Sequence, residues 1–205
     1  TSMKVLADSL LSQPDASVEM YREFLTDINN EIEREDKIIN DLLSLVKFDR
    51  KTGTINVKPT DLNELLEQIL KRLRPIAKKN HVELIFESFR SVSAEVDEVK
   101  LSLALSNLIE NAIDAFSNEK DNNLIKISIF SNSNFINLSI EDNGIGIPEE
   151  QIDYIFDPFY TTKDEHGTGL GLYLVYNEVK KYNGNISIKS EYGVGTKFLI
   201  SINFD

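Results

Sequence analysis

Four short polar signals between residues 106 and 172 constrain the fold and function of this chain more than any other feature of its sequence. Apolar elements lie between these signals, so the scaffold that the elements form would hold all four in place. Together they predict a nucleotide pocket covered by a mobile lid, with the rest of the chain as a support or a partner for it. The four signals read Asn107-Leu108-Ile109-Glu110-Asn111-Ala112, Asp142-Asn143-Gly144-Ile145-Gly146-Ile147-Pro148, Phe156-Asp157-Pro158-Phe159 and Gly167-Thr168-Gly169-Leu170-Gly171-Leu172.

After Gly53, helical and strand patterns alternate along the chain. The expected helices are 61–79, capped by Asp61 and kinked or shortened by Pro75, 97–117, capped by Asp97, and 168–182. The expected strands are 54–58, stopped by Pro59, and 82–87, 92–96, 124–130, 135–141, 185–190 and 196–203. Because antiparallel hairpins dominate, we expect an α+β fold, an α/β two-layer sandwich with helices on one face of a mixed, mostly antiparallel sheet.

The first 52 residues have a different pattern. Residues 18–48 contain neither Gly nor Pro, and their apolar side chains recur three and four residues apart, which predicts one long helix. Residues 1–12 predict a shorter helix, followed by a turn at Pro14 and a cap at Ser17. A helix of about 30 residues is typical of a hairpin or coiled coil. We expect 1–52 to be a helical hairpin whose apolar stripe a second chain covers, and 53–205 a separate domain. The alternative is a helix packed on its own domain.

Composition excludes several classes of protein. The net charge of −12 argues against a nucleic-acid binder, which normally has a basic face. The absence of cysteine excludes disulfides and Cys-ligated metals and fits a reducing cytosol. No apolar run approaches the roughly 20 residues that span a bilayer, and no signal peptide is present. We therefore expect this stretch to be soluble and cytoplasmic.

Asn107 and Asn111 are four residues apart, so a helix projects both from one face. A carboxamide oxygen can ligate Mg²⁺ without adding negative charge beside a nucleotide, so the pair suits phosphate and a hydrated cation. The alternative is a solvated helix face, on which asparagine is ordinary.

Asp142 ends a predicted strand and precedes Gly144 and Gly146. A carboxylate at this position can accept a hydrogen bond from the exocyclic amine of adenine. The neighbouring glycines allow the backbone to approach the base closely. The alternative is an ordinary turn that contains Asp and Gly.

Residues 167–171 open a predicted helix, whose free N–H groups favour phosphate. The pattern is neither the lysine-bearing P-loop nor a dinucleotide fingerprint. About 20 residues with at most one short helix precede it, which is typical of a lid. Lys163 could reach phosphate from this lid or be an ordinary exposed lysine. The residues expected to pin the lid to the body by packing are Phe156 and Phe159.

The order and spacing of the four signals resemble the catalytic ATP-binding domain of sensor histidine kinases, within the gyrase-like ATPase superfamily. The resemblance covers about residues 59–204. Segment 107–112 resembles the N box, 142–148 the first glycine box, 156–159 the F box and 167–172 the second glycine box, and 195–198 resembles the closing motif.

The resemblance implies a role for each matched residue. Asn111 would ligate Mg²⁺, and Asn107 would contact phosphate or the water on the metal. Asp142 would read the adenine amine, and Thr196 would support it through water. The implied cofactors are ATP or ADP with Mg²⁺. The implied nucleotide-binding residues are Asn107, Asn111, Asp142, Gly144, Gly146, Ile147, Lys163, Gly167, Thr168, Gly169, Leu170, Gly171 and Thr196.

The position of Asn107 separates subclasses of this superfamily. Gyrase-type and chaperone-type relatives carry a glutamate there that activates water, whereas an amide cannot act as a general base. The resemblance therefore implies phosphoryl transfer to a protein rather than ATP hydrolysis. Glu110 is a candidate substitute base or a solvated side chain.

The front of the chain resembles the dimerisation and histidine-phosphotransfer hairpin of the same family. This implies a homodimer through the helices, a response regulator as partner, and a full-length protein that is anchored in the bacterial membrane outside this stretch. The only histidines are His81 and His166, and neither is followed directly by Glu or Asp as the phosphoacceptor of this family is. We therefore expect the sequence to begin inside the first helix, past the acceptor, and to be unable to autophosphorylate. The alternatives are a gyrase-like ATPase and a nucleotide-sensing pseudokinase scaffold.

Overall fold

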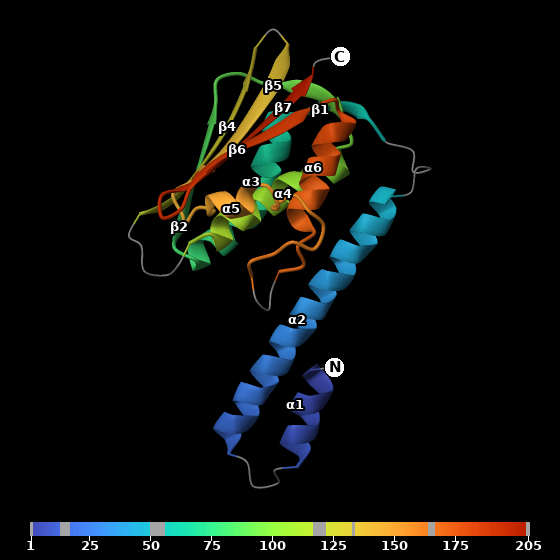
Figure 1. The fold of residues 1–205 in the computed structure, drawn as a ribbon, viewed down its shortest axis with the longest axis vertical. Coiled ribbons are helices and arrows are strands. Elements are labelled where there is room, and N and C mark those ends of the chain that lie inside the picture. Colours follow the sequence, from blue (N-terminus) through green and yellow to red (C-terminus); the bar gives the residue numbers. More distant parts are fainter. Residues whose placement is uncertain are drawn as a thin grey trace. The chain divides into compact units, whose positions relative to one another are not determined.

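The computed structural model describes residues 2–12, 17–49, 56–116, 122–132, 134–163 and 167–203 (Figure 1). The chain divides into two compact units. One consists of Thr1–Lys51 and Thr161–Thr168, and the other of Thr52–Tyr160 and Gly169–Asp205. In the described residues, no helix is both long and apolar enough to cross a membrane.

Two helices make up most of the first unit, α1 (Ser2–Leu11) and α2 (Val18–Asp49), which contact each other. The Ser17 hydroxyl accepts a hydrogen bond from the Met20 amide at 3.2 Å, so the predicted cap of the long helix is confirmed. The predicted helix over residues 18–48 is confirmed, and residues 50–55, which follow α2, lie outside the described residues. Several apolar side chains of α2 stay exposed, including Leu25, Ile39 and Leu43.

The second unit is a two-layer sandwich, as predicted. Its sheet has the strand order β2 (Val82–Ser88), β4 (Asn123–Ser131), β5 (Phe135–Asp142), β7 (Gly195–Asn203) and β6 (Asn185–Glu191). The β2–β4 pair is parallel and the other pairs are antiparallel. The helices α3 (Leu62–Lys79), α4 (Glu98–Asp114) and α6 (Gly171–Lys181) cover one face of the sheet (Figure 1). The smaller elements are a two-stranded sheet of β1 (Lys58–Asp61) and β3 (Ser93–Val96), and the short helix α5 (Glu149–Ile152).

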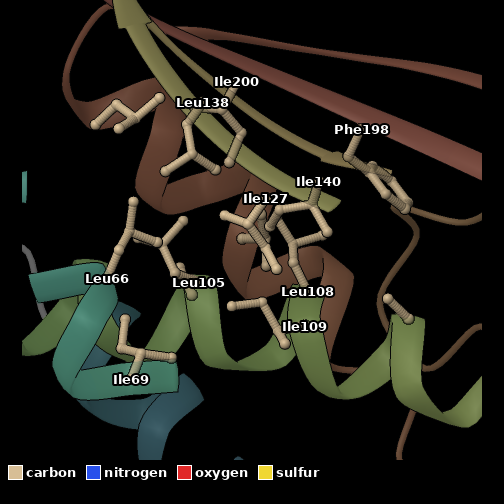
Figure 2. Close-up of a cluster of buried hydrophobic side chains, with 14 of the residues drawn as sticks. Leu66, Ile69, Leu105, Leu108, Ile109, Ile127, Leu138, Ile140, Phe198 and Ile200 are labelled. Atoms are coloured by element: carbon tan, nitrogen blue, oxygen red, sulfur yellow. The ribbon is translucent and has the colours of Figure 1, made fainter. Parts of the chain in front are cut away.

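The core lies between the helical layer and the sheet (Figure 2). Apolar residues three or four apart on α3 and α4 meet alternate apolar residues of the strands, so each element buries one face. The side chains labelled in Figure 2 are Leu66, Ile69, Leu105, Leu108, Ile109, Ile127, Leu138, Ile140, Phe198 and Ile200.

Both predicted aspartate caps are confirmed. The side chain of Asp61 accepts hydrogen bonds from the Asn63 amide at 2.8 Å and the Glu64 amide at 3.1 Å. Asp97 accepts from the Lys100 amide at 3.2 Å, so the start of α4 is held in the same way. The pKa of Asp61 is lowered, mainly by the hydroxyl of Ser91 and also by these amides.

One predicted strand boundary is wrong, and the predicted helix 61–79 forms without being shortened at Pro75. Pro59 does not stop a strand at 58, because β1 spans Lys58–Asp61 with Pro59 opposite Glu95. A residue without an N–H is tolerated there because β1 pairs on one side only. Pro75 does not shorten α3, which continues to Lys79; Leu73 and Ala77 on either side of it stay buried in the core.

Candidate nucleotide site

The two asparagines of the first signal lie on α4 at the rim of the core. Asn107 and Asn111 are half-buried, whereas Leu108 and Ala112 between and beside them are buried. A Cβ added to Gly171 would lie 3.7 Å from Asn107 Cγ and 3.8 Å from Asn111 Nδ2. The structure therefore brings the first and last signals together, with the start of α6 against both amides.

The start of α6 has the properties of an anion site. Leu170 occupies the N-cap position and makes no side-chain cap hydrogen bond. The first N–H groups of a helix lack intrahelical partners and carry the positive end of the helix dipole. The helix begins at Gly171 rather than at 168 as predicted, since Gly169 has a left-handed φ of 66°. Only 1% of Leu170 is exposed, so its contribution to a ligand is limited to its main chain.

Asp142 ends β5 opposite Thr196 on β7, so the predicted pair is brought together. Only 7% of Asp142 is exposed. Its Oδ1 accepts hydrogen bonds from the Gly144 amide at 2.9 Å and the Thr196 amide at 3.3 Å. Two main-chain donors therefore fix the direction in which this carboxylate points.

The segment after Asp142 packs tightly between the end of α4 and the end of β6. A Cβ on Gly144 would lie 2.7 Å from the carbonyl oxygen of Ala115, and one on Gly146 would lie 2.1 Å from that of Glu191. Gly146 also has φ of 73°, which strongly favours glycine. The Ile145 amide donates to Ala115 O at 2.9 Å, so this segment is tied to the end of α4, one turn beyond Asn111.

Ser190 is a site residue that sequence reasoning missed. Its hydroxyl accepts from the Ile147 amide at 2.7 Å, donates to Gly195 O at 3.1 Å and lies 2.9 Å from Thr196 Oγ1. The only signal in the sequence was that Ser190 continues the alternation of apolar residues along β6. Its partner Thr196 could be identified only from the β6–β7 register, which places the two residues opposite each other.

The two ends of the predicted lid, at Phe159 and Gly169, contact each other. The Phe159 amide donates to Gly169 O at 2.9 Å, and a Cβ on Gly169 would lie 2.3 Å from Phe159 C. Phe156 packs against the core, with its ring centroid 5.5 Å from that of Tyr176. The prediction that Phe159 packs is wrong, because its side chain is 63% exposed; its backbone makes the closing contact instead.

Lys163, Gly167 and Thr168 belong to the segment Thr161–Thr168, which groups with the first unit. Within that segment, the Lys163 amide donates to Thr161 Oγ1 at 3.1 Å. A Cβ on Gly167 would lie 2.0 Å from the same oxygen, which explains glycine there. The part of these residues in the site stays a prediction. His166 lies outside the described residues, and His81 is an exposed residue after α3.

The residues present fit Mg²⁺ bound mainly through a nucleotide. No group of three or more acidic or histidine side chains in the described residues is arranged to hold a metal ion. Mg²⁺ needs no such cage, since it is usually held by one or two protein oxygens together with substrate phosphates and water. The amide oxygen of Asn111 is a donor of this type, and Glu110 is half-buried next to it.

Comparison with known proteins agrees with this arrangement. The sequence profile of the histidine kinase-, DNA gyrase B-, and HSP90-like ATPases matches residues 96–205, which include every candidate site residue. The chain therefore belongs to this family of ATPases and carries its ATP-binding domain. Within the family, it groups with the sensor histidine kinases.

The comparisons include one with the relative WalK and two with solved structures of ThkA. The sensor histidine kinase WalK of Bacillus subtilis is 30% identical over 210 residues, which are 100% of this chain and 34% of WalK. The chain thus spans about a third of the length of such relatives. The catalytic domain of histidine kinase ThkA is 29% identical with a TM-score of 0.66, over 73% of this chain and 97% of that domain. ThkA in complex with response regulator TrrA is 23% identical with a TM-score of 0.77, over 99% of this chain and 57% of that one, and shows the same fold.

Proposed function

We propose that this chain binds ATP or ADP with Mg²⁺ as the kinase core of a two-component sensor histidine kinase, and that the whole protein transfers the γ-phosphoryl group to a histidine. The observation that supports this most is the meeting of three distant signals at one end of α4. Asn107 and Asn111 face the start of α6 at Gly171, and Ile145 binds the end of α4 at Ala115. The closeness of these signals supports a single site made of an oriented carboxylate, two amides and a helix start.

The proposed roles follow from these positions. Asp142 accepts the amine of adenine, with Thr196 supporting it through water, and Gly144, Gly146 and Ile147 form the wall beside the base. Asn111 ligates Mg²⁺, and Asn107 binds phosphate or a water on the metal. The phosphates lie on the main chain of 169–171, and Lys163, Gly167 and Thr168 reach them from the lid. Mg²⁺ neutralises charge on the phosphates when bound; the protein positions the group that is transferred.

Transfer is favoured over hydrolysis by the amide of Asn107, which cannot take a proton from water. A gyrase-like ATPase remains the second candidate, because Glu110 projects from the same helix and is half-buried. A pseudokinase scaffold that binds nucleotide without transfer is the third.

We assign residues 1–52 to a truncated dimerisation and phosphotransfer hairpin and 53–205 to the catalytic domain. The exposed apolar side chains of α2 support a homodimer through these helices. Neither His81 nor His166 is followed directly by an acidic residue, so we do not assign the acceptor to either of them. A response regulator, the partner seen with ThkA, receives the phosphoryl group. This stretch is cytoplasmic and binds no nucleic acid, and the full-length protein is anchored in the cell membrane.

Calorimetric titration of ATP with and without Mg²⁺ tests the proposal. We expect Mg²⁺-sensitive binding that Asp142→Asn abolishes and Asn111→Asp weakens. Addition of a separate hairpin that bears the histidine then distinguishes the candidates. Transfer to that hairpin supports the kinase, phosphate release without transfer supports the ATPase, and binding alone supports the scaffold. Absence of ATP binding by the unmutated chain overturns all three.

A further inference from the structure

The far end of the α4–α6 pair holds a buried polar cluster that the proposed function does not use. Glu178 on α6 is 0% exposed. Its Oε1 accepts a hydrogen bond from the Tyr182 hydroxyl at 2.5 Å, and its Oε2 lies 3.1 Å from Lys181 Nζ. A carboxylate is very costly to bury unless its oxygens are paired, so these contacts are needed for the native packing.

Tyr182 links this carboxylate to the beginning of α4. Its hydroxyl accepts from the Asp97 amide at 3.0 Å while donating to Glu178. Burial raises the pKa of Tyr182, and Glu178 raises it further, so the phenol keeps the proton that it donates. Asp97 is the cap of α4 and is itself only 6% exposed. The cluster therefore joins the last turn of α6 to the first turn of α4.

The two helices run in opposite directions, so this cluster and the nucleotide site lie at opposite ends of one pair. Gly171 begins α6 beside Asn107 and Asn111, and Tyr182 ends it beside Asp97. The 11 residues of α6 span about 16 Å. The rest of the α6 surface in the core is apolar and gives little directional preference. A fully satisfied polar network, in contrast, specifies one arrangement.

We propose that Glu178 and Tyr182 are positioning residues for nucleotide binding: they fix the register of α6 on α4 and thereby hold the start of α6 against Asn107 and Asn111. This inference rests on the proposed binding of ATP at that end. Neither residue contacts the nucleotide. A purely structural role would affect the free energy of unfolding but not the affinity of the folded protein for ATP.

The test separates stability from affinity with two variants of this chain. In Tyr182→Phe, the carboxylate of Glu178 and the amide of Asp97 lose a partner. We expect the unfolding midpoint to fall and the ATP affinity with Mg²⁺ to weaken roughly fivefold, within the range measured for positions that couple distant sites. In Tyr182→Phe/Glu178→Leu, no buried carboxylate is left unpaired, so the midpoint should recover while the affinity stays weak.

Ile129→Val is the matched control, because Ile129 is buried in β4 and lies outside the cluster. It should lower the midpoint and leave the affinity unchanged. Recovery of affinity together with the midpoint in the double variant overturns the inference, as does unchanged affinity in Tyr182→Phe. If Tyr182→Phe does not fold, the affinity of the double variant decides alone. Absence of ATP binding by the unmutated chain overturns this inference and the proposed function together, whereas normal binding with unaffected variants overturns this inference only.

Discussion

The proposed nucleotide site has two ends that are built differently, and we name them the adenine end and the phosphate end after the roles proposed above. At the adenine end, defined by Asp142, Gly144, Gly146, Ser190 and Thr196, a buried carboxylate is oriented by main-chain amides and the backbone is packed too tightly for a Cβ. At the phosphate end, defined by Asn107, Asn111 and residues 169–171, half-exposed amides face a helix start that lacks a side-chain cap. A preorganised end provides affinity because little is left to order on binding. An end with more exposed groups suits the metal, the water and the transferred phosphate that we propose there.

The largest effect should come from breaking the adenine end at Gly146. In Gly146→Ala, the new Cβ would lie 2.1 Å from Glu191 O at a φ of 73°. We expect strain and overpacking to cost roughly 3 kcal/mol or more of stability and to abolish ATP binding. Urea unfolding and calorimetry measure both. Gly193→Ala is the control. Gly193 also has a left-handed φ, at 85°, but a Cβ added there would meet no atom within 4 Å. We therefore expect this variant to lose only about 1 kcal/mol of stability and to preserve ATP binding. Equal effects of the two variants would contradict this account.

A substitution at the phosphate end should have a different effect, because it should reduce the dependence of ATP affinity on Mg²⁺. In Asn111→Ala we expect ATP affinity to fall roughly tenfold with Mg²⁺ and to change little in EDTA, since an oxygen ligand is removed. Adenosine, which has no phosphate, should bind both proteins equally because the adenine end is untouched. A loss of adenosine affinity in this variant would show that the two ends are not separable.

A substitution of Ser190 should have a smaller effect on the adenine end. Ser190→Ala leaves the Ile147 amide without its hydroxyl acceptor, and an unpaired buried group costs about 1–3 kcal/mol. We expect that loss of stability and a roughly threefold weaker affinity for adenosine. Ser187→Ala, at an exposed position of the same strand, should stay within about 0.5 kcal/mol of the unmutated chain. A neutral Ser190→Ala would remove Ser190 from the site.

The smallest effect should come from Asp61, which lies outside both ends. Its pKa is lowered in the folded state, so its stabilising contribution is present above the unfolded pKa, about 4, and is lost as the pH falls through the folded value. Asp61→Asn retains a good helix cap and removes this titration. The urea midpoint of the variant should therefore fall less between about pH 5 and pH 3, by a small amount because the group is solvent-screened. Its ATP affinity at neutral pH should be unchanged; a change would link this cap to the site.

Much of the fold could be predicted because it depends on local pattern. The apolar spacing of α3 and the alternation of β4 and β5 are confirmed almost to the residue. The errors arise where a distant partner decides the local structure. The start of α6 depends on the backbone bond between Phe159 and Gly169, and Pro59 is accommodated because β1 has a partner on one side only.

The same reasoning explains what was missed in the site. Asp142, Asn107 and Asn111 could be found because their motifs are contiguous in sequence. Ser190 is recognisable only when the β6–β7 register places it opposite Thr196. Glu178 gives no such signal in the sequence, because an exposed carboxylate could also pair with its helical neighbours Lys181 and Tyr182. Only the fold buries it and brings the Asp97 amide to Tyr182.

The carboxylate of Asp97 has a mechanical consequence. One oxygen caps α4 through the Lys100 amide, and the other accepts from the Asn56 amide at 3.3 Å, in the segment that leads into β1. A displacement of that segment would therefore disturb the same carboxylate that caps the first turn of α4. Because α4 also carries Asn107 and Asn111, this one helix connects the segment before β1 to the two amides that we propose to hold the nucleotide and its metal, without passing through the sheet.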